Sequence, residues 1–337
     1  MRAMLLRRIS DLAREKEPLE LADIPVPVPA DDEVLLEVSA CGVCHTELDE
    51  IEGRTPPPHF PVVPGHEVIG KVVERGKACT LLDVGARVGV GWIHHSDGTE
   101  FENLSDAFCA TGRDVNGGYA EYMTVPERYA CQVPDAFGDL DAAPLLCAGA
   151  VGYRALRLTG LRDGEALGLT GFGGSGHLVL QYAKHLYPSS PIYVFARDAD
   201  AQQFARELGA NWSGDTTATP PAPCRAIIDT TPAWQPVLSA LAVLEPGGRL
   251  VINAIRKEAG DVALMTSIRY EKHLWMEKEI KSVANVTARD VADSLAVAAA
   301  VPVCVEVETY PLEAANEALL SLRAGAIRGA KVLAIRH

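Results

Sequence analysis

EALGLTGFGGSGHLVLQYAKHLY (165–187) is the stretch that decides the fold of this 337-residue chain. A short apolar run, EALGLTG (165–171), leads into a glycine-rich turn, GFGGSGH (171–177), and a helical pattern follows. The G-x-G-x-x-G spacing is weak evidence alone, because an accidental glycine turn can also produce it. Placed between a strand and a helix, however, the spacing predicts a dinucleotide-binding unit.

Each glycine of this turn has its own expected role. Gly171 would allow the tight turn, Gly173 the close approach of a pyrophosphate, and Gly176 the packing of helix on strand. The unpaired N–H groups and the positive dipole end of the following helix would then bind phosphate. The predicted cofactor-binding residues of the turn are Gly171, Gly173, Gly174, Ser175 and Gly176.

Two regions of different pattern flank this turn. Residues 1–140 show short alternating or apolar runs between Gly and Pro residues, which is typical of a compact, barrel-like β domain. A helical pattern follows over 140–160, and beyond it strands alternate with amphipathic helices, which predicts a parallel sheet with right-handed crossovers. The tail, 303–337, reads as strand, helix and strand, and we expect it to rejoin the first domain. The strands expected in the second region are 165–171, 191–197, 224–230, 247–254 and 279–286.

Composition limits the class of partner. A hydrophobic fraction of 48% and a charged fraction of 23% are ordinary for a globular enzyme, and 337 residues suffice for two domains. The net charge of −14 argues against nucleic acid or an anionic membrane as partner. No apolar run reaches the ~20 residues of a membrane span. The charged start, 1–17, has no signal-peptide core, so we expect a cytoplasmic location.

The strand PIYVFAR (191–197) bears on which nicotinamide cofactor binds. An acidic residue at the strand tip holds the ribose 2′-OH of NAD, whereas an Arg accommodates the 2′-phosphate of NADP. Counting back from 208–210 places Ala196 at the tip, so Arg197 would pair with the 2′-phosphate. A register shifted by two would put Asp198 there and favour NAD(H). We favour NADP(H), although Arg197 could also be a solvated surface charge.

Thiolate and imidazole ligands of the kind that a catalytic zinc ion takes occur at three places. Two sulfurs and one nitrogen leave the fourth tetrahedral position open, whereas structural zinc sites are closed by four protein ligands. Alternatively, each could be an ordinary buried thiol or histidine. Cys41 and Cys44 could also form a redox pair, but no thioredoxin-like unit surrounds them. The motifs are CGVCHTELD (41–49), PGHEVIG (64–70) and APLLCAG (143–149).

Together these residues resemble the zinc-dependent medium-chain alcohol dehydrogenases along essentially the whole chain. The resemblance implies α/β plus all-β architecture, with a GroES-like β-barrel catalytic domain (1–148 and 305–337). A Rossmann parallel-sheet domain (149–304) would be inserted, with the active site in the cleft between the two. The matching motifs are CGVCHTEL (41–48), FPVVPGHEVIGKVVERG (60–76), DVGARVGVGW (83–92), NGGYAEYMTVP (116–126), LLCAGAVGYRAL (145–156) and GFGGSGH (171–177).

The resemblance implies roles for single residues. Cys44, His66 and Cys147 look like the ligands of a catalytic zinc, and Glu67 is similar to the acid that displaces water from the metal during ligand exchange. Thr46 matches the hydroxyl that begins the proton relay. His45 stands where the family contacts the cofactor pyrophosphate, or it is an exposed loop histidine.

The implied chemistry is hydride transfer. Zinc would act as a Lewis acid on an alcohol, or on an aldehyde or ketone in reverse. The nicotinamide would then accept or give the hydride, so the small-molecule substrate is an alcohol or carbonyl compound.

Three departures from the family pattern matter. The family's structural zinc needs four cysteines after the GVGW strand, but 94–112 contains only Cys109, so we expect one zinc per chain. Asp49 replaces a relay histidine and would alter the proton path, or it is a helix N-cap or surface carboxylate. Ala330 stands where relatives carry a phosphate-contacting Arg, and either Arg328 or Lys331 could substitute.

Several alternatives stay open at this stage. The substrate could be a polyol or a more specialised alcohol. A catalytically silent nucleotide-binding relative and a metal-free quinone reductase are further options, and the retained zinc ligands disfavour both. The resemblance also implies a homodimer or homotetramer, commonly formed through an edge of the Rossmann sheet.

Overall fold

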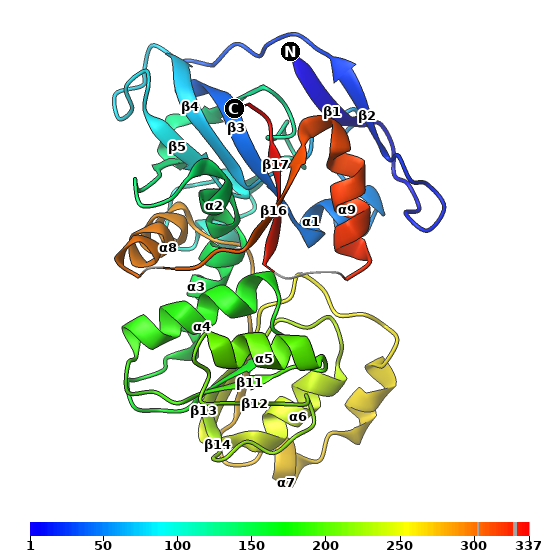
Figure 1. The fold of residues 1–337 in the computed structure, drawn as a ribbon, viewed down its shortest axis with the longest axis vertical. Helices are drawn as coiled ribbons and strands as arrows, with labels where there is room; N and C mark the ends of the chain where they lie inside the picture. Colours follow the sequence, from blue (N-terminus) through cyan, green and yellow to red (C-terminus); the bar gives the residue numbers. More distant parts are fainter. Residues whose placement is uncertain (302, 326–328, 337) are drawn as a thin grey trace. The chain divides into compact units, whose positions relative to one another are not determined.

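The computed structural model describes residues 1–301, 303–325 and 329–336, which form two compact units (Figure 1). The first unit comprises Met1–Ala150, Asn285–Ala300 and Cys304–His337, and the second comprises Val151–Ala284 and Val301–Val303. The division near residue 150 lies close to the expected one. A mainly β first unit and a parallel doubly wound sheet in the second unit are the fold class that the sequence predicts.

The second unit is built on six parallel strands. Their spatial order is β12-β11-β10-β13-β14-β15, so the first strand of the unit lies near the middle. This is the order of the doubly wound dinucleotide-binding fold. The sequence pattern misses only β12, which has too few residues to show alternation. The strands are β10 (Leu167–Thr170), β11 (Ile192–Phe195), β12 (Trp212–Gly214), β13 (Cys224–Asp229), β14 (Leu244–Ile252) and β15 (Glu279–Ser282).

Helices cover the middle of this sheet, where the strands are apolar on both faces. All four residues of β10 are buried, as expected for a central parallel strand. On one side, Phe195, Ile227 and Leu250 of the sheet pack with Leu241 of α6. The α-helices are α3 (Ala148–Thr159), most of which lies in this unit, α4 (Gly174–Leu186), α5 (Ala199–Glu207), α6 (Gln235–Val243) and α7 (Tyr270–His273), and a 3₁₀ turn spans Val262–Ser267.

The first unit is organised around β3, an 11-residue strand that is buried along most of its length. The last strand of the chain, β17, pairs antiparallel with β3, with Lys331 opposite Val43. In Figure 1 the red C-terminal strand accordingly lies beside the blue β3. The sheet order is β16-β17-β3-β4-β5-β9, with β8 also on β3. These strands are β16 (Val307–Pro311), β17 (Ala330–Ala334), β3 (Glu33–Val43), β4 (Val68–Arg75), β5 (Arg87–Val90), β9 (Ala130–Gln132) and β8 (Tyr122–Pro126).

Short elements complete the first unit. Two small antiparallel pairs are β1 (Arg2–Leu6) with β2 (Leu19–Asp23), and β6 (Ile93–His95) with β7 (Cys109–Ala110). The helices are α1 (His45–Ile51), α2 (Asp139–Ala142), α8 (Ala288–Ala300) and α9 (Ala315–Arg323). The 3₁₀ turns are Glu102–Leu104, Glu127–Tyr129, Ala143–Leu146 and Leu312–Ala314.

Helix α8 belongs to the first unit. The expected domain limits instead place it in the span 149–304. Its start is tied to the loop after β6. The backbone N–H of Ala288 donates to Glu102 Oε1 at 2.8 Å, and Asn285 Nδ2 donates to the carbonyl of Asn103 at 3.1 Å. Amphipathic spacing identifies such a helix, but it does not identify the surface on which the helix packs.

The helix expected over 140–160 is broken in three. Helix α2 ends at Ala142, a 3₁₀ turn covers Ala143–Leu146, and α3 then runs over Ala148–Thr159. Pro144 lacks a backbone N–H and cannot continue the helical hydrogen-bond ladder. Cys147 lies at the break, with φ −122° and ψ −72°. Gly160, at φ +65°, ends α3 where the sequence predicts.

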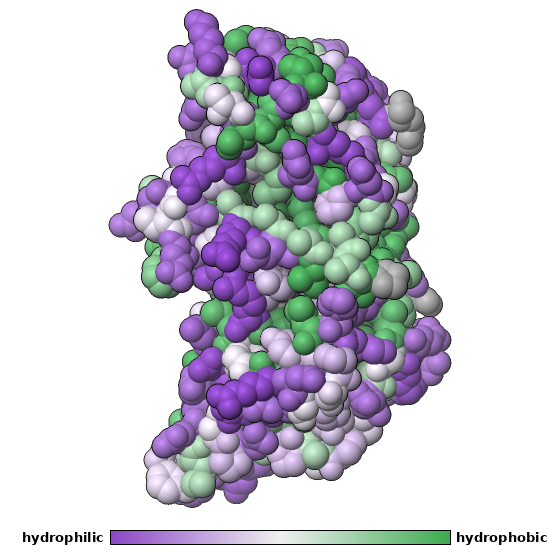
Figure 2. All heavy atoms as spheres, turned by 90° about the vertical axis from the view of Figure 1, so that its left-hand side faces the viewer, coloured by the Kyte–Doolittle hydropathy of each residue, from purple (hydrophilic) through white to green (hydrophobic). Residues whose placement is uncertain are grey.

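The surface is mixed in character. Figure 2 shows hydrophobic residues among hydrophilic ones on one face. Within the described residues, no helix combines the length and apolar character needed to cross a membrane.

Candidate metal centre and cofactor loop

Cys44 lies where β3 ends and α1 begins. Its backbone is extended, with φ −118° and ψ 164°, and it occupies the N-cap position of the helix. Glu47, in the first turn of α1, accepts a hydrogen bond from the Cys44 N–H through Oε2 at 2.9 Å. The start of the helix therefore fixes the backbone from which the Cys44 thiol projects.

His66 and Glu67 come from the turn that precedes β4, and two glycines make room for that turn. Gly65 has φ +99°, and a Cβ there would lie 2.3 Å from the ring of Tyr119. A Cβ on Gly42 would lie 1.8 Å from Glu67 Oε2. Only glycine fits at these two positions while the buried His66 and Glu67 side chains keep their places.

The structure brings Cys44, His66, Glu67 and Cys147 together. One ligand atom from each lies within 4.8 Å of the others. The two Sγ atoms are 3.9 Å apart. Two thiolates bound tetrahedrally to one zinc at ~2.3 Å would be about 3.8 Å apart. The donor atoms of these four residues therefore fit a single ion of this kind.

The imidazole of His66 is oriented by Glu47. Its Nδ1 lies 2.5 Å from Glu47 Oε1, and both side chains are almost completely buried. Its Nε2 is buried and has no hydrogen-bond partner among the described residues. When Nδ1–H faces a carboxylate, the other ring nitrogen keeps its lone pair, as in carboxylate–histidine–metal arrangements.

Titration of the cluster also indicates a place for a cation. A hydrogen bond from Cys147 lowers the pKa of the Cys44 thiol well below its usual value. Burial raises the pKa of Glu67 well above its usual value, and the nearby charge of Cys44 adds to this. Burial similarly raises the pKa of Glu50. A divalent ion among these groups would offset the cost of burying so many acidic side chains.

The remaining residues predicted on α1 have different surroundings. Thr46 is buried, and its Oγ1 lies 3.6 Å from Cys44 Sγ. His45 is exposed at the first position of the helix. Asp49 is buried within α1, and its Oδ1 accepts from Arg54 Nε at 2.5 Å. The alternatives of an N-cap or a surface carboxylate are therefore wrong for Asp49, while its part in a proton path stays a prediction.

Aromatic side chains line one side of the cluster. The ring centroids of His66 and Trp92 are 6.2 Å apart, and Phe108 packs edge-on against Trp92 at 5.7 Å. The Arg113 guanidinium lies over the Trp92 ring, 5.5 Å from its centroid. These residues give the cluster an apolar wall with one cation behind it.

The glycine turn has the geometry that its sequence predicts. Gly171 has φ +83°, and its N–H donates to Phe195 of β11 at 2.9 Å. A Cβ on Gly176 would lie 2.7 Å from the Gly171 carbonyl, so close packing of helix on strand requires glycine there. A Cβ on Gly173 would meet nothing within 4 Å. Gly174 and Ser175 begin α4, and the first N–H groups of a helix have no partner within the helix.

The residues that follow β11 bear on whether NADP(H) or NAD(H) is the expected cofactor. The strand ends at Phe195, Ala196 is buried, and Arg197 is exposed. Asp198 caps α5, and its carboxylate accepts from the N–H groups of Asp200 and Ala201 at 3.1 and 3.4 Å. That carboxylate is thus already used by the helix start.

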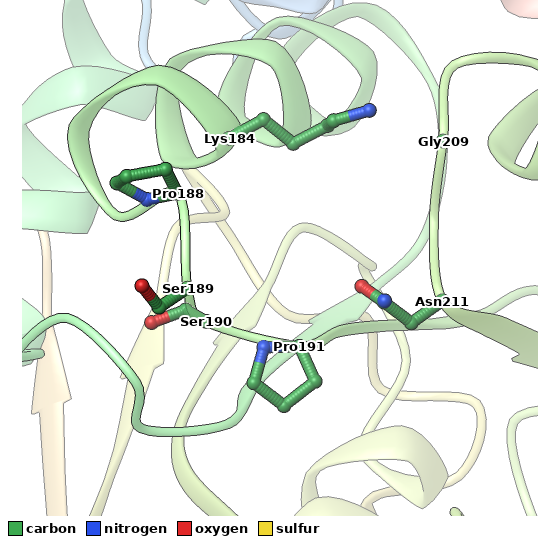
Figure 3. Close-up of a pocket in the computed structure, with 7 residues that line it drawn as sticks. All are labelled: Lys184, Pro188, Ser189, Ser190, Pro191, Gly209 and Asn211. Atoms are coloured by element: carbon green, nitrogen blue, oxygen red, sulfur yellow. The ribbon is translucent and has the colours of Figure 1, made fainter.

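A small cavity of about 250 Å³ lies elsewhere in the second unit (Figure 3). Pro191 and Asn211, which line it, immediately precede β11 and β12. It therefore opens at the amino ends of the strands, whereas cofactors bind at the carboxyl ends of such sheets. This cavity is not the cofactor site.

Known proteins that are similar to this chain in sequence are named alcohol dehydrogenases. The family model described as "Alcohol dehydrogenase GroES-like domain" matches residues 30–135. A protein of Mycobacterium tuberculosis (strain CDC 1551 / Oshkosh), named "Probable alcohol dehydrogenase AdhA", is 41% identical over 329 residues. The match covers 94% of this chain and 93% of that relative. The chain belongs to the zinc-dependent medium-chain alcohol dehydrogenase family.

Two further comparisons agree with this family assignment. An alcohol dehydrogenase of Geobacillus stearothermophilus is 32% identical over 341 residues, covering 96% of this chain and 97% of the relative. Among solved structures, a cobalt- and zinc-bound thermostable alcohol dehydrogenase from Pyrobaculum aerophilum has a TM-score of 0.85 at 23% identity. The structural match covers 99% of each chain, and the two proteins share the fold.

The sequence motifs of this alcohol dehydrogenase family member do not single out Glu47. A carboxylate three residues after a helix cap is an available signal, but it usually indicates helix capping alone. Two residues near Ala330 could replace the phosphate-contacting Arg of the family. One of them, Lys331, is buried, and its ammonium contacts Glu308 and the Tyr310 hydroxyl. Arg328 lies outside the described residues.

We expect Glu47→Gln to lower zinc affinity about 10- to 100-fold, because an amide cannot replace both contacts of the carboxylate. Competition with a chromogenic chelator would measure the affinity. Glu52→Gln is the matched control, since that carboxylate pairs with Arg54 and Arg323 at the other end of α1. Equal zinc affinity in the two variants would contradict a role for Glu47 in orienting His66.

Proposed function

We propose that this chain is a zinc-dependent alcohol dehydrogenase that transfers hydride between a primary or secondary alcohol, or an aldehyde or ketone, and NADP(H). The observation that carries the proposal is the convergence of two thiols, one imidazole and one carboxylate within 4.8 Å. The names of the relatives from Mycobacterium and Geobacillus, and the zinc in the Pyrobaculum structure, support it.

In this proposal Cys44, His66 and Cys147 hold the single catalytic ion. Zinc there would supply the Lewis acidity that lowers the pKa of an alcohol substrate. Glu67 is close enough to exchange with a departing ligand. The buried hydroxyl of Thr46, beside Cys44, would take the substrate proton first, and Asp49 would act further along this path.

The glycine turn would hold the cofactor. The open space at Gly173 and the N–H groups at the start of α4 suit a pyrophosphate, and the exposed His45 is available for a second contact. A nicotinamide cofactor bound there would supply the hydride acceptor.

The zinc requirement is tested by removing one ligand. We expect Cys147→Ser to lose the zinc ion of this cluster and at least about 10³-fold in kcat/KM for alcohol oxidation, because several kcal/mol of charge stabilisation depend on the metal. The assay is NADPH absorbance with ethanol, benzyl alcohol or an aldehyde, before and after chelation. Cys304→Ser is the control, since that thiol is exposed. Activity that survives complete zinc removal would favour a metal-free reductase.

The preference for NADP(H) follows from the tip of β11. Ala196 offers no acid for the ribose, and Asp198 is engaged by α5, so Arg197 is the side chain left to meet a 2′-phosphate. The backbone N–H and hydroxyl of Thr217 lower the pKa of Asp215, and Arg197 adds to this effect. The guanidinium therefore acts beyond the strand ends, where the adenosine ribose would bind.

We expect Arg197→Ala to raise KM for NADPH roughly 10- to 100-fold, the range for a lost hydrogen bond to a charged group. KM for NADH should change little, because that cofactor has no 2′-phosphate. Arg206→Ala, which changes an arginine of helix α5, is the control. A parallel rise for both cofactors would instead indicate a general structural effect.

The assembly in this proposal is a homodimer or homotetramer. All four residues of the edge strand β15 are exposed, and Tyr270, Trp275 and Ile280 expose apolar surface in the same segment. Unprotected edges of this kind pair readily with another strand. We expect sedimentation to give a mass of two or four times the chain mass of 36.0 kDa. The Ile280→Lys variant should sediment with a mass closer to that of a single chain. An unchanged mass for Ile280→Lys, as for the control Val28→Lys, would exclude this edge as the contact.

A further inference from the structure

Two histidines and a cysteine gather on the small hairpin of β6 and β7. His95 lies directly opposite Cys109 in the antiparallel register. Neighbouring residues of a regular strand point to opposite faces, but the register shifts between Ile93 and His95. Such a bulge lets consecutive side chains turn to the same side. His94, His95 and Cys109 consequently offer their ligand atoms to one point.

The spacing of these atoms suits a metal ion. The Nδ1 atoms of His94 and His95 are 3.3 Å apart, and all three ligand atoms lie within 4.8 Å of one another. Two nitrogens bound tetrahedrally to zinc at ~2.0–2.1 Å would be separated by about 3.3–3.4 Å. The histidine pair thus matches one edge of a zinc tetrahedron.

We propose that His94, His95 and Cys109 form a second metal site that binds Zn²⁺. Two imidazoles and one thiolate are ligands that zinc accepts, and water would complete the tetrahedron. The site uses none of the residues around Cys44 and does not depend on the proposed reaction. The expectation of one zinc per chain counts only cysteines, whereas two of the donors here are histidines.

The surroundings hold these side chains in place. His94 is buried, and its ring is hydrogen-bonded to the backbone of Thr124. A backbone partner of this kind orients a metal-ligating histidine. Cys109 is half-buried beside the Arg113–Asp114 ion pair. His95 is exposed and gives an ion a path of entry.

An ion at this site would also affect the aromatic contact between Trp92 and Phe108, which lies beside the cluster around Cys44. A metal shared by β6 and β7 closes the loop 96–108, and Phe108 at the end of that loop packs on Trp92. Because Trp92 lies next to His66, an ion on the hairpin would hold this aromatic contact in place. Metal binding that closes a loop stabilises the fold.

The test counts zinc in the full chain. After equilibrium dialysis against a buffered micromolar level of Zn²⁺, we expect two ions per chain in the unmodified protein. His95→Ala and Cys109→Ala should each retain one, and His185→Ala, which changes an exposed histidine of α4, should retain two. Substitution by Co²⁺ gives a second readout, because Cys109→Ala should lose part of the thiolate charge-transfer absorption.

The outcomes separate this site from the proposed catalytic centre. Cys147→Ser should keep one ion if the hairpin site exists, whatever becomes of the proposed function. One ion in the unmodified protein and none in Cys147→Ser would overturn the proposal. Equal counts in the unmodified protein and Cys109→Ala would do the same, and would leave the two histidines sharing only an N–H···N hydrogen bond.

Discussion

The carboxylate of Glu47 is the contact on which the metal centre depends. One oxygen accepts the backbone N–H of Cys44, and the other lies against Nδ1 of His66. It thereby joins the start of α1 to the turn before β4, just beyond the last backbone hydrogen bond between the two segments, from the Gly42 N–H to the Glu67 carbonyl at 2.9 Å. A buried charge without partners would be costly, so the cluster is stable only when imidazole, thiols and carboxylates are balanced together. A divalent cation among these groups would supply that balance.

Much of the fold follows from local pattern, because the relevant signals are short-range. The turn at Gly171 and the strands on either side of it predict the parallel sheet, and Gly171 and Gly176 have the turn and packing roles that their spacing indicates. The break before α3 and the packing of α8 could not be predicted in the same way. Helical spacing identifies a buried face, but it does not reveal where Pro144 interrupts the ladder or which surface accepts α8.

The candidate sites show the same limit at the level of side chains. Cys44, His66 and Cys147 are recognisable by residue type and motif, whereas Glu47 looks like an ordinary helix cap. Only the folded turn brings it to His66. The histidine pair of the hairpin is hidden for a related reason. Strict alternation would place His94 and His95 on opposite faces, and the register shift that reunites them has no sequence signature here.

The absence of a side chain at Gly42 has a consequence for motion. Glu67 Oε2 rests where a Cβ of residue 42 would be, so the backbone of β3 closes one side of that carboxylate. A swing toward the strand is blocked, whereas the Cys44 and Cys147 thiols and the His66 imidazole lie within 4.8 Å of a carboxylate oxygen. The backbone at Gly42 thus limits the movement of Glu67 on the side of β3 and leaves the side of the thiols and the imidazole.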